Sequence, residues 1–256
     1  MTQTKLVFEH VTKLYTSVHG GTPAVAVQDF SLDVSSNSFV CLLGASGCGK
    51  STLLNMAAGF VAPSSGRILV DGRPITAAGA DRGVVFQEYA LFPWYTVQGN
   101  VELGPQARGI PARERQEIAE RYLSMVGLRD HRHKYPKELS GGMKQRAAIA
   151  RTLANDPEII LMDEPFGALD AQTREALQDE LLQIWESTRK TVLFVTHSIQ
   201  EAVLLSDTIA LLAPHPGRLV DVVHNDLPRP RDRSDDAVMA LEKQIYGRRD
   251  ATGAPA

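Results

Sequence analysis

The 256-residue sequence predicts an α/β fold built on a largely parallel sheet. Three observations support this prediction. Short apolar segments that end in turn residues recur along the chain, helical patterns lie between them, and a glycine-rich loop follows the first segment. Short bounded apolar segments are typical of strands that are buried on both faces of a parallel sheet. Strands that alternate with helices favour an α/β architecture with right-handed crossovers.

Five apolar segments are the predicted strands of this sheet. They are FVCLLG (39–44), GVVF (83–86), IILMD (159–163), TVLFVT (191–196) and TIALLA (208–213). Helices are expected at about 50–58, 112–126 and 171–188. In the second of these, Ile118, Tyr122 and Val126 are spaced by four residues, and Gly127 is a helix stop signal. In the third, apolar residues at the same spacing share one face.

Two parts of the chain depart from this alternation. Residues 88–138 have no convincing strand and are predicted to be a helical insertion. From about residue 226 the sequence is polar and rich in Pro and Arg (NDLPRPRDRSDD), which predicts a surface segment before one short helix. The last residues, 247–256, are expected to be disordered. We therefore expect a single domain over 5–230 and a short C-terminal segment over 231–256.

Composition excludes several classes of protein. Hydrophobic residues make up 43% and charged residues 22%, which is ordinary for a globular protein. The net charge of −3 provides no overall basic field for nucleic acid, so we expect no nucleic-acid partner. Cys41 and Cys48 match no zinc spacing and are too few for a disulfide framework, which favours a reducing cytoplasm.

The sequence shows no sign of membrane insertion. Residues 1–15 alternate polar and apolar residues and lack the apolar core of a signal peptide. No stretch approaches the roughly 18 apolar residues that a membrane span needs. Any membrane role is therefore expected to act through a partner.

The glycine-rich loop GASGCGKS (44–51) matches the phosphate-binding pattern G-x-x-x-x-G-K-[ST] between a strand and a helix. Its glycines allow the backbone N–H groups to surround phosphates. Lys50 is expected to reach the β- and γ-phosphates, Ser51 to bind Mg²⁺, and Thr52 to reach the α-phosphate. The alternative is a glycine-rich turn that matches by chance. The expected nucleotide-binding residues are Gly44, Ala45, Ser46, Gly47, Cys48, Gly49, Lys50, Ser51 and Thr52.

Polar residues end three other predicted strands. Asp163 and Glu164 follow a buried strand, and ligands of open α/β sheets bind at the carboxyl ends of strands. Asp163 is expected to hold Mg²⁺ through water, and Glu164 to polarise the water that attacks the γ-phosphate. Gln87 is a candidate contact of the metal or of that water, and His197 of the γ-phosphate. The alternatives are a solvated acidic turn and a structural histidine.

A second anion site is predicted in LSGGMKQRAAIAR (139–151), where a Ser and two Gly precede a helix. Free N–H groups and the dipole at a helix N-terminus favour an anion. A generic phosphate-loop enzyme has no need of this second site.

With this segment, the chain resembles the ATP-binding cassette (ABC) family over about 5–225. The motifs occur in family order: Tyr15, GASGCGKST, VVFQ, LSGGMKQR, IILMDEP, GALD and FVTHS. The resemblance implies a P-loop NTPase (RecA-like) core with a parallel sheet, an antiparallel β N-terminal subdomain and an inserted α-helical subdomain. It also implies hydrolysis of ATP with Mg²⁺ as cofactor.

The resemblance further implies a head-to-tail homodimer. In the family, the residues that correspond to Ser140, Gly141 and Gly142 close over the γ-phosphate that a second subunit holds. The resemblance also implies that Asp170 lines the dimer seam and that Tyr15 stacks on adenine, although a lone Tyr near a strand is usually a packing residue. Two departures are a longer segment after Tyr15 (TSVHGGTPAVAV) and Met143, where Gln is common.

Finer resemblance points to importers. DRGVVFQEYALFPWY, DEPFGALDAQTRE and PGRLVDVVHNDLPRPRD are similar to the ATPase subunits of nitrate, sulfonate and taurine uptake systems, the taurine type most. This resemblance implies integral-membrane permease subunits as partners and, indirectly, a periplasmic or extracellular binding protein. It implies a peripheral position at the cytoplasmic face of the inner membrane. The long C-terminal regulatory domain of maltose-type importers is not expected. The substrate is chosen by the partners.

A group of aromatic residues has two interpretations. Either it is a local core of the helical insertion, or it is a groove where the membrane subunit docks, as in the family. The residues are Phe86, Tyr89, Phe92, Trp94 and Tyr95.

Three other functions stay open as alternatives to an importer ATPase. The first is the ATPase subunit of an exporter. The second is a soluble ABC protein that acts on nucleic acid or ribosomes, although these proteins usually carry two cassettes or a long coiled-coil insertion. The third is a module that binds nucleotide without hydrolysis, against which Glu164 and His197 argue.

Overall fold

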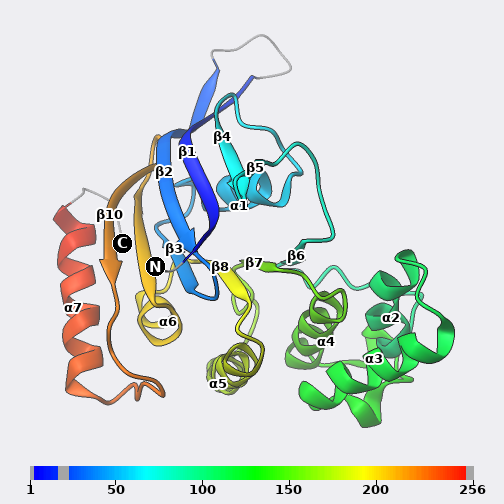
Figure 1. Cartoon of the computed structure of the whole chain (residues 1–256). Helices are drawn as coiled ribbons and strands as arrows, with labels where there is room; N and C mark the ends of the chain where they lie inside the picture. The colour runs from blue at the N-terminus through cyan, green and yellow to red at the C-terminus, as the bar shows by residue number, and fades with distance from the viewer. Residues whose placement is uncertain (1–2, 17–22, 252–256) are drawn as a thin grey trace. The chain divides into compact units, whose positions relative to one another are not determined.

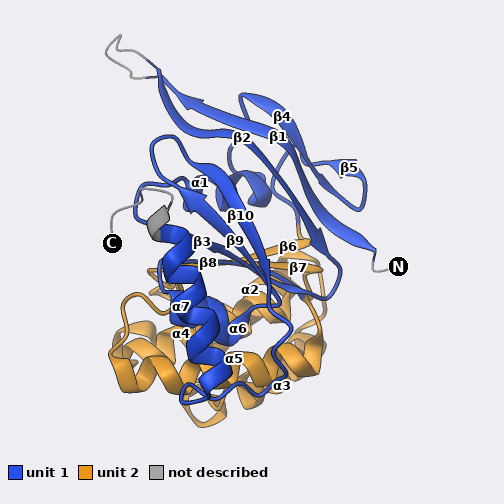
Figure 2. Cartoon of the chain, turned by 90° about the vertical axis from the view of Figure 1, so that its left-hand side faces the viewer, with its two compact units in different colours: residues 1–79, 191–256 blue, residues 80–190 orange. Residues whose placement is uncertain are grey.

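The computed structural model describes residues 3–16 and 23–251, which fall into two compact units. Unit 1 comprises residues 1–79 and 191–256, and unit 2 comprises residues 80–190 (Figure 2).

Unit 1 contains two groups of paired strands. The first is an antiparallel sheet in the order β2-β1-β4-β5. In the second, in the order β10-β9-β3-β8, β3 runs parallel to β8 and β9, and β10 is antiparallel to β9 (Figure 1). The strands are β1 (Thr4–Tyr15), β2 (Ala24–Ser35), β3 (Phe39–Leu43), β4 (Ser65–Val70), β5 (Arg73–Pro74), β8 (Thr191–Thr196), β9 (Thr208–Ala213) and β10 (Arg218–His224). The helices are α1 (Lys50–Ala58), α6 (Ile199–Leu205) and α7 (Asp236–Ala251).

The core of unit 1 contains two kinds of strand, fully buried parallel strands and partly buried antiparallel strands. Every residue of β3 and β8 is buried, as expected for apolar central strands. In strand β1, buried residues alternate with more exposed ones. Phe8 of this strand packs edge-on against Phe30 of β2, with the ring centroids 5.3 Å apart. Strand β2 contacts β8, β10 and α1, so the antiparallel sheet packs against the second group of strands and against the helix that follows the glycine-rich loop.

Unit 2 is mainly helical. Strands β6 (Arg82–Val85) and β7 (Ile159–Asp163) pair in parallel, and α2, α3 and α4 pack on one another. Helix α4 also contacts β6 and α5. The helices are α2 (Val97–Ala107), α3 (Ala112–Met125), α4 (Gly141–Ala154) and α5 (Ala171–Thr188), with the 3₁₀ turns η1 (Arg129–His131) and η2 (Pro136–Glu138).

The predicted fold class is confirmed. The five predicted strands and the helices at 50–58, 112–126 and 171–188 form within one residue of the expected limits. The segment 88–138, all of which the structure describes, contains helices and no strand, as predicted. The limits of a single domain at 5–230 stay a prediction.

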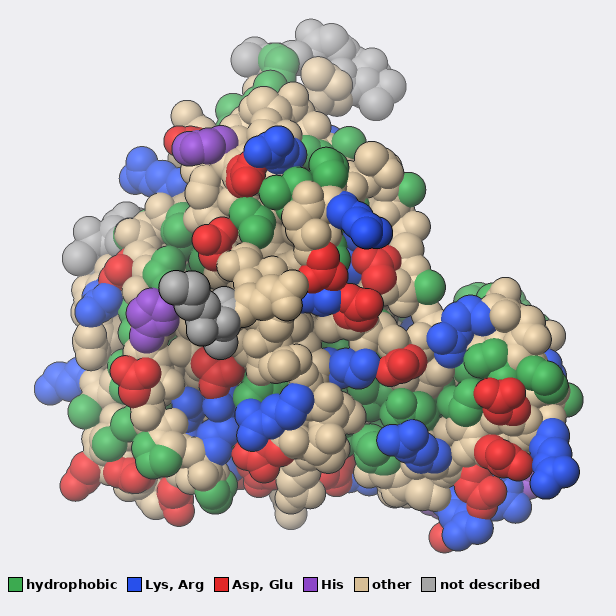
Figure 3. All heavy atoms as spheres, viewed as in Figure 1, with side chains coloured by type: hydrophobic (Ala, Val, Ile, Leu, Met, Phe, Trp, Pro, Cys, Tyr) green, Lys and Arg blue, Asp and Glu red, His purple; other side chains and the backbone are tan. Residues whose placement is uncertain are grey.

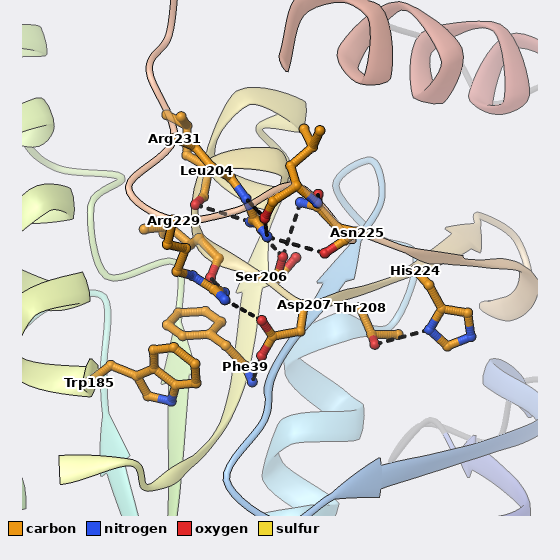
Figure 4. Close-up of polar contacts among 12 residues, drawn as sticks. Phe39, Trp185, Leu204, Ser206, Asp207, Thr208, His224, Asn225, Arg229 and Arg231 are labelled. Carbon is orange, nitrogen blue, oxygen red and sulfur yellow. Dashed lines mark hydrogen bonds and ion pairs between the residues drawn. The ribbon is translucent and has the colours of Figure 1, made fainter. Parts of the chain in front are cut away.

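The expectation of a surface segment near the C-terminus is wrong for two of its residues. Asn225 and Arg231 are buried because their side chains bond the backbone at the end of α6 (Figure 4). Helix α7 is 16 residues long rather than short, since Val238 and Ile245 bury apolar surface. It continues through 247–251, so disorder was wrongly expected there, and 252–256 lie outside the described residues.

The distribution of charged side chains on the surface is consistent with the small net charge of −3. On the face that Figure 3 shows, acidic and basic side chains are interspersed among the described residues. In the described part of the chain, no helix is both long enough and apolar enough to cross a membrane. Cys41 and Cys48 are both buried free thiols, and burial raises the pKa of each.

Candidate functional site

The glycine-rich loop connects β3 to α1 in unit 1, as predicted. Gly49 precedes α1 with a φ of 83°, in the left-handed region. A Cβ at Gly49 would lie 2.7 Å from Cγ2 of Val27 and 2.8 Å from the carbonyl oxygen of Ala26. Glycine is therefore required, both for the backbone angle and for the close approach of β2.

Lys50 places a positive charge inside this loop. The residue is 5% exposed, and its Nζ donates hydrogen bonds to the carbonyl oxygens of Gly44 at 2.8 Å and Ala45 at 2.9 Å. Within the described residues, no side chain caps the start of α1, and its first turn carries no acidic residue. The helix N-terminus and the ammonium group together form a site for an anion such as phosphate.

Ser51 and Thr52 lie in the first turn of α1, exposed and half-buried respectively. The β9–β10 hairpin is a neighbour of the loop that the sequence analysis missed. Cε1 of His215 lies 3.8 Å from the position of a Cβ on Gly47. Gly217 exchanges backbone hydrogen bonds with β2, at 3.0 Å and 2.8 Å. This hairpin could have been predicted from the sequence, because PHPG (214–217) is a typical turn sequence between two strand patterns.

His197 follows the last residue of β8 and is exposed. Its neighbours in sequence fix the backbone on both sides. The amide of Ser198 donates to Oγ1 of Thr196 at 3.0 Å, and Oγ of Ser198 accepts from the amide of Glu201 at 3.3 Å, which caps α6. The imidazole thus stands at the junction between a buried strand and a capped helix.

Tyr15 is the last residue of β1 and is 44% exposed. Nζ of Lys13 lies 5.2 Å from the centroid of its ring, within reach of a cation–π contact. The ring is therefore partly exposed, and its stacking on adenine stays a prediction. Residues 17–22 of the longer segment after it lie outside the described residues.

In unit 2, β7 ends at Asp163, and Glu164 follows with a φ of 41°. A non-glycine residue in the left-handed region is strained, and such residues concentrate at functional sites. The amide of Gly167 donates to the carbonyl oxygen of Glu164 at 3.0 Å, which closes a turn. Nε2 of Gln87 lies 3.1 Å from the position of a Cβ on Gly167. The structure therefore brings Gln87 to the acidic turn, because β6 and β7 are paired in parallel.

The LSGG segment forms the N-terminus of α4. Oγ of Ser140 accepts a hydrogen bond from the amide of Met143 at 3.3 Å, so Ser140 is the N-cap. A hydroxyl that accepts in this way still has its own hydrogen to donate to an anion. A Cβ at Gly142 would lie 2.7 Å from Cγ2 of Thr173, which explains glycine at this position. The first turn of α4, which the structure describes in full, contains no acidic residue.

Asp170 has a local role that the sequence analysis did not assign. It is the N-cap of α5, and its Oδ1 accepts from the amide of Thr173 at 3.0 Å. Hydrogen bonds from Thr173 lower the pKa of Asp170, which is exposed. A role at a dimer seam stays a prediction and does not compete with this cap.

Replacing Asp170 with alanine is expected to lower the melting temperature by a few degrees, whereas asparagine keeps the cap and most of the stability. Because the folded-state pKa is lowered, the carboxylate stabilises the fold above its ordinary pKa. That stabilisation is lost as the pH falls through the lowered pKa. Thermal denaturation from neutral to acidic pH tests this. Equal melting temperatures of wild type and Asp170→Ala at neutral pH would contradict it.

The aromatic group divides into packed and exposed members. The rings of Phe92, Trp94 and Tyr95 contact one another, with centroids 5.6 to 6.5 Å apart. Phe92 is half-buried, whereas Trp94 is 67% and Tyr95 38% exposed. Arg151 of α4 donates to the carbonyl oxygen of Tyr89 at 3.1 Å and also to that of Ala90. The packed members fit a local core, and the exposed ones leave an apolar surface.

The predicted metal donors are chemically suited to Mg²⁺. Ser51, Asp163 and Gln87 offer a hydroxyl, a carboxylate and an amide oxygen, and Mg²⁺ prefers hard oxygen ligands. It commonly uses one or two protein side chains together with phosphate oxygens, so this small set is sufficient.

Comparison with known proteins agrees with these features. The family model described as ABC transporter matches residues 27–167. A taurine import ATP-binding protein of Roseobacter denitrificans is 50% identical over 199 residues, 78% of this chain and 74% of that protein. A nitrate import ATP-binding protein of Synechococcus elongatus is 46% identical over 231 residues, 89% of this chain and 84% of that protein. A solved dimeric ATP-binding cassette in a post-hydrolysis state, bound to ADP and Pi, has a TM-score of 0.74 and 32% identity, and the match covers 89% of this chain and 99% of that chain.

Proposed function

Since the chain belongs to the ABC transporter family and is an ATP hydrolase coupled to transport, we propose that it powers a membrane importer of a small anion such as taurine, another sulfonate or nitrate. One observation carries the proposal. Two import ATP-binding proteins are 50% and 46% identical to this chain over the aligned residues, and the first is named for taurine and the second for nitrate. Both named substrates are small and carry an anionic group, so the proposed substrate class is a small molecule with such a group.

Nucleotide binding is assigned to the glycine-rich loop. Lys50 pairs with the β- and γ-phosphates, and the N–H groups at the start of α1 donate to their oxygens. Ser51, Asp163 and Gln87 would hold Mg²⁺, which supplies positive charge to the phosphate oxygens when it is bound. Tyr15 provides a flat ring for adenine.

Hydrolysis is assigned to three residues. Glu164 orients and polarises the attacking water, since a carboxylate can accept its proton. Gln87, beside the turn that follows Glu164, contacts the same water or the metal. His197 donates a hydrogen bond to the γ-phosphate, where charge develops in the transition state.

The LSGG segment is assigned to the nucleotide of a second copy of the chain. Support comes from the N-terminus of α4, where Ser140 is exposed and the first turn contains no acidic residue, and from its separation in sequence from the first phosphate site. Ser140, Gly141 and Gly142 would contact the γ-phosphate, and Asp170 would lie at the seam. A two-fold homodimer then has two composite sites.

The chain is proposed to act at the cytoplasmic face of the inner membrane, bound to permease subunits. A binding protein outside the membrane would deliver the substrate to those subunits. Reconstitution in proteoliposomes with the permease and binding protein encoded beside its gene tests this. ATP enclosed with the chain should drive uptake of labelled taurine or nitrate only when the binding protein is present. Export of substrate, or uptake that does not need ATP, would contradict the proposal.

Replacing Trp94 with glutamate is expected to abolish this uptake and leave ATP binding by the isolated subunit unchanged. The indole is 67% exposed beside Phe92 and Tyr95, and a charge buried at a protein interface costs several kcal/mol. The measurements are co-purification with the permease subunits and ATP-driven uptake. Phe60→Glu is the matched control, because Phe60 is also exposed, at 51%, but lies in unit 1. Normal co-purification of Trp94→Glu would overturn docking here, and a failure to fold would favour the local core.

A further inference from the structure

The polar segment 225–231 (NDLPRPR) contains no residue that is assigned to ATP binding or hydrolysis. Its most buried cation is Arg231, which is 8% exposed. Its guanidinium donates to five backbone carbonyl oxygens. They belong to Val203 (2.8 Å), Leu204 (3.3 Å), Ser206 (2.8 Å), Asn225 (3.2 Å) and Leu227 (3.0 and 3.1 Å). Burial, and then the charge of Arg229, lower the pKa of Arg231 to about 10, so it stays protonated at neutral pH.

Three of these acceptors lie at the end of α6. The last carbonyl groups of a helix have no partner within the helix, and a cation there is favourable. Nδ2 of Asn225, which is 5% exposed, donates to the carbonyl oxygens of Val203 at 2.8 Å and Ser206 at 3.1 Å. Figure 4 shows Asn225 and Arg231 converging on Ser206. The segment therefore caps the C-terminus of α6 from outside the helix.

The same segment also reaches the start of β3. Arg229 donates to the carbonyl oxygen of Leu205 at 2.7 Å and pairs with the Asp207 carboxylate. The other oxygen of Asp207 accepts from the amide of Phe39 at 2.8 Å. Phe39 begins the strand that ends at the glycine-rich loop, so one polar network joins α6, β3 and segment 225–231 (Figure 4).

Helix α6 depends on its ends because it has only seven residues. Isolated helices of this length are not stable, so tertiary contacts must hold it. Its N-cap is Ser198, directly after His197, and Glu201 of its first turn accepts a hydrogen bond from Thr196. A displacement of α6 would move this cap and the backbone of His197 with it.

We propose that Arg231 is a positioning residue for His197: it caps α6 and thereby holds the imidazole in place for hydrolysis. The proposal rests on the proposed function of His197 at the γ-phosphate. It assigns a role in the ATPase cycle to a segment about 30 residues beyond FVTHS, the last of the ATPase motifs in the sequence.

The test compares Arg231→Met and Arg231→Lys, alone and combined with His197→Ala, in the full chain. Lysine keeps the charge but not the planar fork of donors, so it rescues only part of the cap. We expect Arg231→Met to lower kcat about tenfold, with KM nearly unchanged, because a misplacement of about 1 Å can cost roughly 100-fold and a smaller displacement costs less. Amide hydrogen exchange over 199–205 should accelerate in both variants. Lys243→Met, an exposed site on α7, is the matched control and should change neither quantity.

The double variants separate positioning from general destabilisation. If Arg231 acts through His197, Arg231→Met adds no further loss of kcat to His197→Ala, since coupled residues are non-additive. An equal loss in both backgrounds would overturn the proposal. Wild-type kcat in Arg231→Met, with a lowered kcat in His197→Ala, would overturn this proposal alone. Wild-type kcat in His197→Ala would overturn the assigned role of His197 and this proposal with it. Should Arg231→Met fail to fold, the same comparisons are made with Arg231→Lys.

Discussion

Replacing Lys50 with alanine is expected to abolish tight binding of ATP, and with it hydrolysis, while the fold stays intact. The ammonium group lies inside the glycine-rich loop, where it donates to the carbonyl oxygens of Gly44 and Ala45. Hydrogen bonds to a charged group contribute about 1.5–3 kcal/mol each, and the β- and γ-phosphates offer two. The dissociation constant should therefore rise by about 100-fold or more.

Titration with MgATP by calorimetry measures this effect, and circular dichroism checks the fold. Lys243→Ala is the matched control, because Lys243 is an exposed lysine on α7. Lys50→Ala also removes the hydrogen bond to the buried carbonyl oxygen of Gly44, so the nucleotide-free protein should lose some stability and keep its fold. Near-wild-type affinity of Lys50→Ala for MgATP would contradict the assignment of this loop to the nucleotide site.

The parts of the site that could be predicted from sequence are those that local chemistry determines. The glycine-rich loop needs a strand before it and a helix after it, and both follow from short-range patterns around 39–58. The acidic turn at Asp163 and Glu164 follows from an apolar strand that ends in carboxylates. A largely parallel sheet was also expected, but not which strands pair, and the observed pairing of β6 with β7 explains why Gln87 lies at that turn.

The contacts that could not be predicted join residues far apart in sequence. Arg231 was expected at the surface because arginine is rarely buried without partners. Its partners are backbone carbonyl oxygens of 203–206, and no side-chain pattern reveals them. The hydrogen bonds from Arg151 to Tyr89 and Ala90, both with a positive φ, are equally hidden, since they span about 60 residues. The role of Asp170 as a helix cap could be predicted from the sequence, because Asp directly before a helix is a common N-cap.

Replacing Glu164 with glutamine is expected to slow hydrolysis at least about 100-fold, to leave ATP binding intact, and to trap a homodimer while ATP is present. Glutamine keeps the size and a polar contact of the carboxylate but cannot take the proton of the attacking water. The left-handed backbone of Glu164, with a φ of 41°, is equally accessible to glutamine, so the turn to Gly167 should persist. Glu186→Gln, at an exposed site on α5, is the matched control.

The trapped dimer follows from the second anion site. When the γ-phosphate survives, it remains available to the N-terminus of α4 of the other subunit. There Ser140 holds the cap while its hydroxyl hydrogen is available to donate, and Gly141 and Gly142 present backbone N–H groups. Charge-assisted hydrogen bonds to phosphate are stronger than neutral ones, and a two-fold dimer contains two such sites. ADP lacks the γ-phosphate, so ADP should leave the protein mostly monomeric.

Light scattering after size exclusion, with ATP, with ADP and without nucleotide, measures the dimer, and phosphate release measures hydrolysis. Both are run up to high protein concentration, so that a weak dimer is also detected. Adding Ser140→Arg should prevent the dimer, since the larger side chain fills the place of the γ-phosphate, whereas Ser140→Thr keeps a cap and a hydroxyl and should preserve it. Wild-type hydrolysis by Glu164→Gln would exclude Glu164 as the base. Slow hydrolysis without dimerisation at saturating ATP would instead contradict the binding of LSGG to a partner's nucleotide. In that case the γ-phosphate would be intact and yet would not be bound by the second subunit.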